Sequence, residues 1–248
     1  MIAAMHSALV RRTPDCGPLR LGRGQMTSFG LDPRWLLVEV HQLHRRALER
    51  EGAQERTGAN DLAVDGETRI VRFVIDGRLD RFHGDSVAIF ERMTLPSAAT
   101  LWSSVTRFVA ERGAEARVEL VSQAALTCGH SLDASDVMAS EFGEPRCHMH
   151  RVLGALDLDE AGRPAEAVLV DAFARAESIM LADATGLTRR REIDIRGRAS
   201  CGDTIDVSTR IRRLDNAGQN NWKLVGTARR RSDGHLLATC ETCLDALT

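Results

Sequence analysis

Three landmarks occur twice in the sequence, in the same order each time. They are Gly84-Asp85 and Gly202-Asp203 before apolar runs, Trp102 and Trp222, and the turns at Gly113 and Gly234. The second member of each pair follows the first by 118, 120 or 121 positions. Three displacements of nearly equal length indicate a duplicated unit of about 120 residues. The 248 residues of the chain are therefore expected to form two similar halves.

Each unit is predicted to contain one long helix. Asp32 and Pro33 supply an N-cap and a first helical residue, so the first helix is expected over about residues 33–50. In the second unit apolar residues again recur every three or four positions, and Gly186 is suited to end that helix. The two apolar stripes are Leu36, Val40, Leu43 and Ala47, and Leu169, Phe173, Ala176 and Met180.

Alternating apolar and polar residues predict antiparallel strands after each helix. The strands are expected at 68–76, 85–95, 101–111 and 116–124, then at 190–198, 203–213, 220–231 and 235–244, with one more before each helix at 6–12 and 148–156. Since each sheet would bury one face against its own helix, the fold class is α+β. The predicted organisation is a first repeat over 1–126, a linker over 127–147 and a second repeat over 148–248, with 52–67 inserted after the first helix.

The charge balance gives no indication of a nucleic-acid partner. The chain carries 33 Lys and Arg against 35 Asp and Glu, so it has no basic surplus for a polyanion. No apolar run is long enough for a membrane span or a secretory signal, so a cytoplasmic location without a membrane partner is expected. Cys240 and Cys243 lie three positions apart in a predicted strand, where they point to opposite faces, so no metal site is expected.

The order of strand, helix and antiparallel strands, with a Gly-Asp pair entering a long strand, resembles the hotdog fold, here as a double hotdog. Three segments are also similar to the double-hotdog biosynthetic proteins typified by the leinamycin acyltransferase/decarboxylase. They are residues 24–37 with Gly30-Leu31-Asp32-Pro33, residues 189–204 with Arg189-Arg190-Arg191-Glu192-Ile193, and residues 231–238 with Ser232-Asp233-Gly234-His235.

This resemblance implies an enzyme of polyketide-type biosynthesis that acts on acyl thioesters. The acyl group would be carried by coenzyme A or by the phosphopantetheine arm of an acyl carrier protein, with no permanently bound cofactor. Thioesterase or decarboxylase/acyltransferase-like activity is expected, in a monomeric pseudo-dimer or a homodimer. Two alternatives stay open: a hotdog dehydratase or isomerase acting on a carrier-bound acyl chain, and a non-catalytic carrier-protein docking or binding module.

The chain departs from that family in two places. The type member passes its acyl group through a tyrosine, and this sequence contains no tyrosine. Transfer by that route is excluded, so any acyl transfer needs another hydroxyl group. Before the second helix the family tends to carry an Asp-x-Asn-Gly-type loop, of which only Asp159 and Gly162 remain. One of the two potential pockets is therefore expected to be degenerate or to position substrate only.

Candidate catalytic residues lie before the first helix. The resemblance implies a pocket between the halves near the start of that helix, where free N–H groups can hold a thioester carbonyl. Thr27 and Ser28 offer hydroxyl groups there, and Asp32 offers a carboxylate. A capping or turn role is the alternative for all three residues.

Side chains on the two helices supply further candidates. His41 and His44 share a face of the first helix and are suited to general acid or base catalysis, with a hydrogen-bonded core position as the alternative. His44 is preferred because a histidine there also matches the family. Asp171 and Glu177 are candidates for the carboxylate that single-hotdog thioesterases use, unless they face solvent.

The run Arg189, Arg190 and Arg191 is the candidate phosphate-binding segment. Guanidinium groups bind phosphate through two N–H groups, so these residues could grip the pantetheine phosphate or a carrier-protein surface. A solvated run of charges at the opening of a strand is the alternative.

Overall fold

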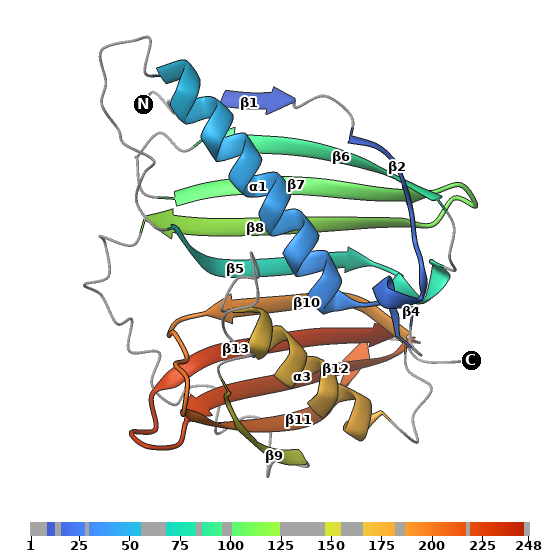
Figure 1. The fold of residues 1–248 in the computed structure, drawn as a ribbon. Coiled ribbons are helices and arrows are strands. Elements are labelled where there is room, and N and C mark those ends of the chain that lie inside the picture. The colour runs from blue at the N-terminus through green and yellow to red at the C-terminus, as the bar shows by residue number, and fades with distance from the viewer. Residues whose placement is uncertain are drawn as a thin grey trace, which may run out of the picture.

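The computed structural model describes residues 9–12, 16–27, 30–55, 68–82, 86–95, 101–124, 147–154, 166–181, 187–216 and 219–245. In this part of the chain, two helices lie on one face of a large antiparallel sheet (Figure 1). Neither helix is long and apolar enough to cross a membrane.

Each predicted helix and strand has a counterpart in the structure. The first half contains β1 (Leu9–Arg12), β2 (Cys16–Arg20), η1 (Arg23–Gln25), β3 (Met26–Thr27), β4 (Gly30–Leu31), α1 (Pro33–Glu55), β5 (Thr68–Gly77), η2 (Leu79–Arg81), β6 (Ser86–Leu95), β7 (Leu101–Ala110) and β8 (Glu115–Ala124). The second contains β9 (Cys147–Val152), α3 (Ala167–Met180), β10 (Leu187–Ile195), β11 (Thr204–Asn216), β12 (Gln219–Arg230) and β13 (Leu236–Asp245).

The main differences from the predicted boundaries concern α1 and the two connecting segments. Helix α1 continues to Glu55, so the first four residues of the predicted insertion 52–67 are helical. The rest of that insertion and residues 127–146 of the predicted linker lie outside the described residues, as does Gly186.

The strand order is mirrored about the centre of the sheet. The strands follow one another as β1-β6-β7-β8-β5-β10-β13-β12-β11-β9, with β2 also paired to β6. Phe73 of β5 is opposite Ile193 of β10, which follows it by 120 positions. Gly113 and Gly234 adopt φ of 80° and 70° in the equivalent turns after β7 and β12, a conformation that favours glycine. Two repeats related by a pseudo-twofold axis therefore meet at β5 and β10.

The predicted apolar stripes hold both helices on the sheet. All four stripe residues of α1 are buried, as are Leu169, Phe173 and Ala176 of α3, while Met180 is half-buried. Corresponding stripe residues lie 133 positions apart, 13 more than the strands, because α1 extends further beyond its stripe than α3 does and a longer segment follows it. Apolar side chains of both repeats form one continuous cluster, from which Ala47 and Leu48 are separate.

Charged side chains also join the repeats where β5 and β10 pair. Arg72 forms an ion pair with Glu192, which follows it by 120 positions and lies diagonally across the two strands. Arg72 Nε also lies 3.8 Å from Oδ1 of Asp194, directly opposite it. Opposite charges on facing strands favour this pairing.

Gly226 of β12 lies close beneath α3 and generates a stability prediction. A Cβ atom at this position would lie 2.8 Å from Cε1 of Phe173, whose ring is buried, so the ring or the strand would have to shift. Gly226→Ala is therefore expected to lower the free energy of unfolding by about 1–3 kcal/mol, as overpacking does. Urea unfolding measures the effect, with Gly24→Ala as the control because no atom lies within 4 Å of its added Cβ. Equal stability of the two variants would contradict the packing described here.

Candidate functional site

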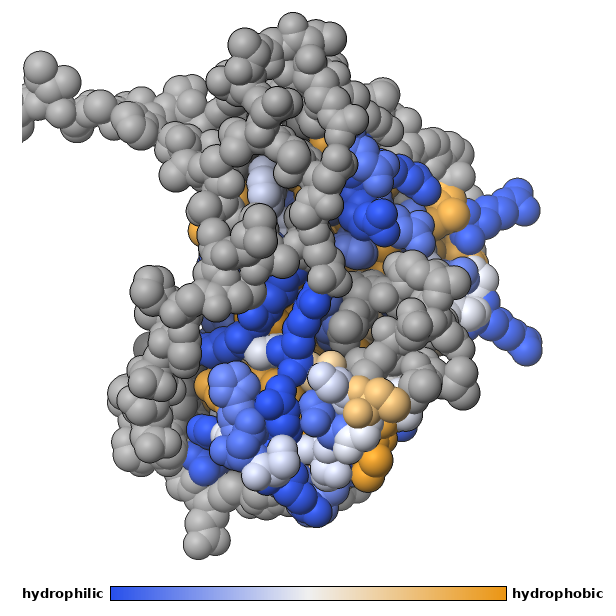
Figure 2. Space-filling view, turned by 60° about the vertical axis from the view of Figure 1, so that its left-hand side comes forward, coloured by the Kyte–Doolittle hydropathy of each residue, from blue (hydrophilic) through white to orange (hydrophobic). Residues whose placement is uncertain are grey.

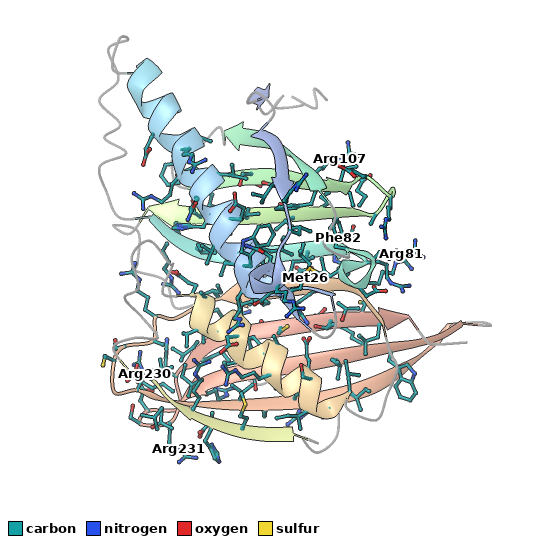
Figure 3. The ribbon with its side chains drawn as sticks, turned by 45° about the vertical axis from the view of Figure 1, so that its right-hand side comes forward. Met26, Arg81, Phe82, Arg107, Arg230 and Arg231 are labelled. Atoms are coloured by element: carbon teal, nitrogen blue, oxygen red, sulfur yellow. The ribbon has the colours of Figure 1, made fainter. Side chains whose placement is uncertain are left out.

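A cavity of about 420 Å³ lies where the first turns of α1 and α3 meet, between the two repeats. Its lining residues are Gly24, Asp32, Arg34, Trp35, Val38, Arg151, Ala167, Val168, Asp171 and Arg175. Figure 3 shows Met26 beside the first turn of α1, at the junction of the two halves. Arg230 and Arg231 lie far from this junction, at the outer end of the second half (Figure 3).

The cavity lies across the pseudo-twofold axis. Helix positions 133 apart are equivalent, and three such pairs contribute to the lining: Arg34 and Ala167, Trp35 and Val168, and Val38 and Asp171. The residue types differ within each pair. One asymmetric cavity is thus formed by the facing helix starts.

Asp171 is the central charged group of the cavity. Its Oδ1 lies 3.1 Å from Nη1 of Arg34, and its Oδ2 lies 3.0 Å from Nε of Arg175 and also pairs with Arg151. The Asp171 side chain is 8% exposed, whereas those of Arg34 and Arg175 are 47% and 58% exposed. The carboxylate therefore lies in the wall, and two of its three arginines reach solvent. Figure 2 shows strongly hydrophilic residues gathered across the middle of one face of the molecule.

Arg34 joins carboxylates from both repeats. Its Nη2 lies 2.9 Å from Oδ2 of Asp32, while its Nη1 contacts Asp171. The hydrogen bond to Asp32 raises the pKa of Arg34, with a further contribution from the charge of Asp171. Asp32 is thus in the cavity, as predicted, but its carboxylate is fully engaged in capping and ion pairing.

The two helix starts differ in the N–H groups that they leave open. In α1, Pro33 has no N–H, the N–H of Arg34 donates to Oδ1 of Asp32 at 2.8 Å, and that of Leu36 donates to the carbonyl of Asp32. In α3 no side chain caps the helix, and the N–H groups of Ala167 and Val168 have no partner among the described residues. Among the described residues, α1 thus leaves the N–H of Trp35 without a partner, because Asp32 and Pro33 account for the others. At α3 two N–H groups are open.

The side chain of His44 lies between α1 and the sheet, outside the cavity. Its Nε2 and Nδ1 atoms are hydrogen-bonded to the hydroxyl groups of Ser122 at 2.7 Å and Ser104 at 2.8 Å. Burial, together with the charge of His41, lowers the pKa of His44 to about 3. A serine–histidine pair has the contacts of an activated nucleophile, but all three side chains are sealed from solvent. The structure thus gives His44 the surroundings of a satisfied core residue.

His41 also lies outside the lining of the cavity. Its side chain is half-buried, and its Nδ1 atom has no partner within the described part of the chain. Burial lowers the pKa of His41 to about 4, with a smaller contribution from the charge of Arg45. The two predicted histidines therefore do not meet the carboxylates of the cavity.

Glu177 occupies the position equivalent to His44 in the second repeat. It is 4% exposed and accepts a 2.5 Å hydrogen bond from the hydroxyl of Thr242, itself 120 positions after Ser122. It also forms a buried ion pair with Arg191. Burial would lower the pKa of Arg191, but the charge of Glu177 outweighs it and the pKa is raised. Both repeats thus place a polar side chain of the helix against the hydroxyl group at the same place in the sheet.

The predicted arginine run is divided between two environments. Arg191 is buried against Glu177, whereas Arg189 and Arg190 are exposed, and Arg190 Nη2 lies 2.9 Å from Oε2 of Glu192. Neighbouring residues of a strand point to opposite faces, so the run does not form one phosphate-binding patch.

The remaining predicted residues are the two hydroxyl residues before α1 and the two cysteines of β13. The backbone of Thr27 pairs with Gly30 next to the cavity, but its side chain and the whole of Ser28 lie outside the described residues. Cys240 is buried and Cys243 is half-buried on the other face of β13, as predicted. No group of three or more His, Cys, Asp or Glu side chains in the described ranges is arranged to hold a metal ion.

Several charged residues of this region were missed by the sequence analysis. They are Arg34, Arg151 and Arg175 in the cavity, and Glu166 at the start of α3. Burial raises the pKa of Glu166, and its Oε1 atom has no partner in the described segments. The sequence does contain an indication for Arg175, because it follows Asp171 by four positions on a helix, a spacing that favours an ion pair.

Comparisons with solved structures cover almost the whole chain. A protein described as an oleoyl thioesterase from Lactobacillus plantarum is 11% identical, with a TM-score of 0.64 over 98% of each chain. The 12:0-ACP thioesterase from Umbellularia californica is 7% identical, with a TM-score of 0.62 over 95% of this chain and 93% of that one. A MaoC-like dehydratase is 12% identical, with a TM-score of 0.57 over 96% of this chain and 98% of its own. No family model and no curated protein sequence matches the chain.

The chain therefore has the double hotdog fold, as predicted. At these identities the similarity concerns the fold. The narrower similarity to the leinamycin type stays a prediction.

The buried histidines predict a loss of stability in mild acid. In the folded protein the rings of His41 and His44 stay neutral until the pH falls to about 4 and 3, whereas unfolded histidine takes up its proton near pH 6.5. The contribution of the two neutral rings to the free energy of unfolding is therefore present above pH 6.5. It is lost as the pH falls, by up to about 1.4 kcal/mol per pH unit for each ring. Urea unfolding between about pH 7 and 5 should show a shallower pH dependence for His44→Gln than for the unmodified protein. His150→Gln, at an exposed position, is the control, and equal slopes for all three proteins would contradict this account.

Proposed function

We propose that the chain is an acyl-thioester processing enzyme of the hydrolase or acyltransferase type. The observation that carries this proposal is the cavity between the repeats, in which the start of α3, not capped by any side chain of the described residues, lies beside apolar and cationic side chains. An uncapped helix start combines open N–H groups with the positive end of the helix dipole, a combination suited to a carbonyl oxygen that gains negative charge. Trp35, Val38 and Val168 offer apolar surface next to these donors.

The proposed reaction uses water and the N–H groups of α3. The thioester carbonyl oxygen accepts hydrogen bonds from Ala167 and Val168 while the oxygen of water forms a bond to the carbonyl carbon. The carbonyl π electrons move to the oxygen, which becomes an oxyanion held by the same donors. Collapse of this intermediate breaks the carbon–sulfur bond, and the products are a carboxylate, a thiol and one released proton.

Asp171 acts in this proposal as a positioning group. Both of its oxygens are engaged by arginines, so it holds three guanidinium groups around the substrate instead of serving as a free base. For transfer instead of hydrolysis, Thr27 and Ser28 remain the proposed hydroxyl acceptors, because tyrosine is absent. A role in polyketide-type biosynthesis, with coenzyme A or an acyl carrier protein as carrier, rests on the resemblance of residues 24–37, 189–204 and 231–238.

A dehydratase is the second candidate, since a MaoC-like dehydratase shares the fold. Dehydration of a carrier-bound hydroxyacyl chain needs a base to remove an α-proton and an acid to protonate the leaving hydroxyl. Histidine is the usual group for such work, and none of the described residues that line the cavity is a histidine. The cavity therefore favours carbonyl chemistry at the thioester over dehydration.

The proposal predicts a chemical change in carrier-bound acyl groups. Malonyl, methylmalonyl, 3-hydroxyacyl and longer acyl groups on a carrier protein and on coenzyme A are incubated with the protein, and intact mass is measured. Loss of the whole acyl group indicates hydrolysis, loss of carbon dioxide indicates decarboxylation, and loss of water indicates dehydration. Binding without any change would support the docking module and overturn the enzymatic proposal.

A second prediction concerns Asp171. Asp171→Asn keeps the shape of the side chain but removes the charge that orders the arginines, so kcat/KM is expected to fall at least about tenfold. Asp206→Asn is a matched control, because Asp206 is ion-paired with Arg231 and does not line the cavity. Equal activity of the two variants would remove Asp171 from the site. Retained turnover in His44→Gln would likewise remove that histidine from the mechanism.

A further inference from the structure

The described lining of the cavity holds little apolar surface. Four of its ten residues are apolar, five are charged and one is glycine. The apolar residues are Trp35 and Val38 of α1 and Ala167 and Val168 of α3. An acyl chain gains binding free energy by removing apolar surface from water, so it gains it only where it meets these four residues. The composition of the lining therefore limits the chain more than the volume of about 420 Å³ does.

Trp35 and Val38 form the apolar part of the α1 wall. They lie three positions apart and share one face of the helix. The Trp35 ring packs edge-on against Phe108, with 6.1 Å between the ring centroids. Phe108 is fully buried, and Trp35 also packs against the apolar cluster of the core. The core thus supports this part of the wall.

The position of α3 that is equivalent to Val38 carries a charge. It is Asp171, whose carboxylate is engaged by Arg34, Arg151 and Arg175. All four of these charged residues line the cavity. A methylene group that covers them takes polar groups out of water, which costs free energy instead of gaining it. A chain that grows beyond the apolar residues therefore gains nothing further.

The layer between the helices and the sheet adds no surface to the described lining. Of the strands, only β9 contributes to it, through Arg151. Helix side chains that face the sheet are packed in the apolar cluster, and Leu36, Val40 and Phe173 are at most 1% exposed. Within the described residues, the apolar surface offered to an acyl chain is therefore that of the cavity lining itself.

The spacing of Trp35 and Val38 indicates a chain length. Helix α1 rises about 4.5 Å between them. An extended alkyl chain advances about 1.3 Å per carbon by standard bond lengths, so about three or four carbons cover this distance. With the thioester carbon and the α-carbon, the total is about six carbons. Val38 is the last α1 residue of the described lining, and His41 and Gln42, which follow it at a spacing of three and four, do not belong to that lining.

We propose that the cavity selects short acyl chains, of about two to six carbons, and that Val38 sets this limit beside Trp35. This inference rests on the proposed function, since it names the acyl group of the thioester held at the start of α3. The hydrogen bonds of the thioester carbonyl are the same for every chain. Selection among chains therefore depends on the apolar contacts, which differ with chain length.

The test compares straight acyl chains of two to twelve carbons on coenzyme A and on an acyl carrier protein. Each methylene group that reaches apolar surface should raise kcat/KM about fourfold. The gain is expected to end at about six carbons, after which kcat/KM stays level or falls. A gain that continues to twelve carbons would overturn the length limit.

Two substitutions of Val38 should change the limit in opposite directions. Val38→Ala removes two methyl groups and is expected to extend the gain by about one or two carbons. Val38→Phe adds a ring and is expected to lower the ratio of kcat/KM for six carbons to that for two carbons by about tenfold. Val152→Ala and Val152→Phe are the matched controls, since Val152 is an exposed valine of β9 that does not line the cavity. A chain-length profile that neither Val38 variant changes would overturn the assignment of Val38.

Unreactive thioether analogues of the same chains separate this inference from the proposed function. Their affinity, measured by calorimetry, depends on the chain and not on any reaction. If no thioester is turned over but the affinity rises up to about six carbons and depends on Val38, the proposed function fails and the length limit stands. If thioesters are turned over but the gain continues to twelve carbons, the length limit fails and the proposed function stands.

Discussion

The pairing of β5 with β10 is the interaction on which the rest of the structure depends. It joins two half-sheets into one, with Phe73 opposite Ile193 at the pseudo-twofold axis. Because the sheet is continuous, both helices lie on the same face and their first turns meet. The cavity exists only at that meeting point, and it draws its lining from both repeats. A fold that buries each helix on its own sheet thus gains a shared site from one additional pair of strands.

Burying the charged groups of the cavity costs desolvation free energy, so their presence needs a reason other than stability. Taking a carboxylate such as Asp171 out of water requires compensating partners, and three arginines supply them. Apolar residues of similar volume often stabilise a protein as well as a buried ion pair does, so stability alone gives no reason for this cluster. Arg191 and Glu177 form a second such pair, below the helix, with Thr242 as an additional donor. The cavity cluster differs from it in reaching solvent, through Arg34 and Arg175.

Most of the fold could be predicted from the sequence, because local periodicity and the repeat specify it. The cap at Asp32 and both apolar stripes follow from residue types at fixed spacing. The site could not be predicted to the same extent, since Arg34, Arg151 and Arg175 are brought together only by tertiary structure. His44 shows the limit most clearly: its sequence position suited catalysis, but Ser104 and Ser122 come from strands distant in the chain and satisfy it in the core. The small number of open N–H groups at the start of α1 was predictable in principle, since a proline without an N–H and an aspartate cap occur there in sequence.

The ion pair across the central strands bears on how the two halves pair. Arg72 and Glu192 are equivalent positions of the two repeats, and they meet diagonally across the axis. If the first repeat associated with a copy of itself in this register, arginine would meet arginine. If the second did so, Glu192 would meet Glu192 and Asp194. Pairing of two identical halves would therefore bring like charges together, whereas the two different halves bring opposite charges together. The charges at these positions therefore favour the pairing of two different halves over the pairing of two identical ones.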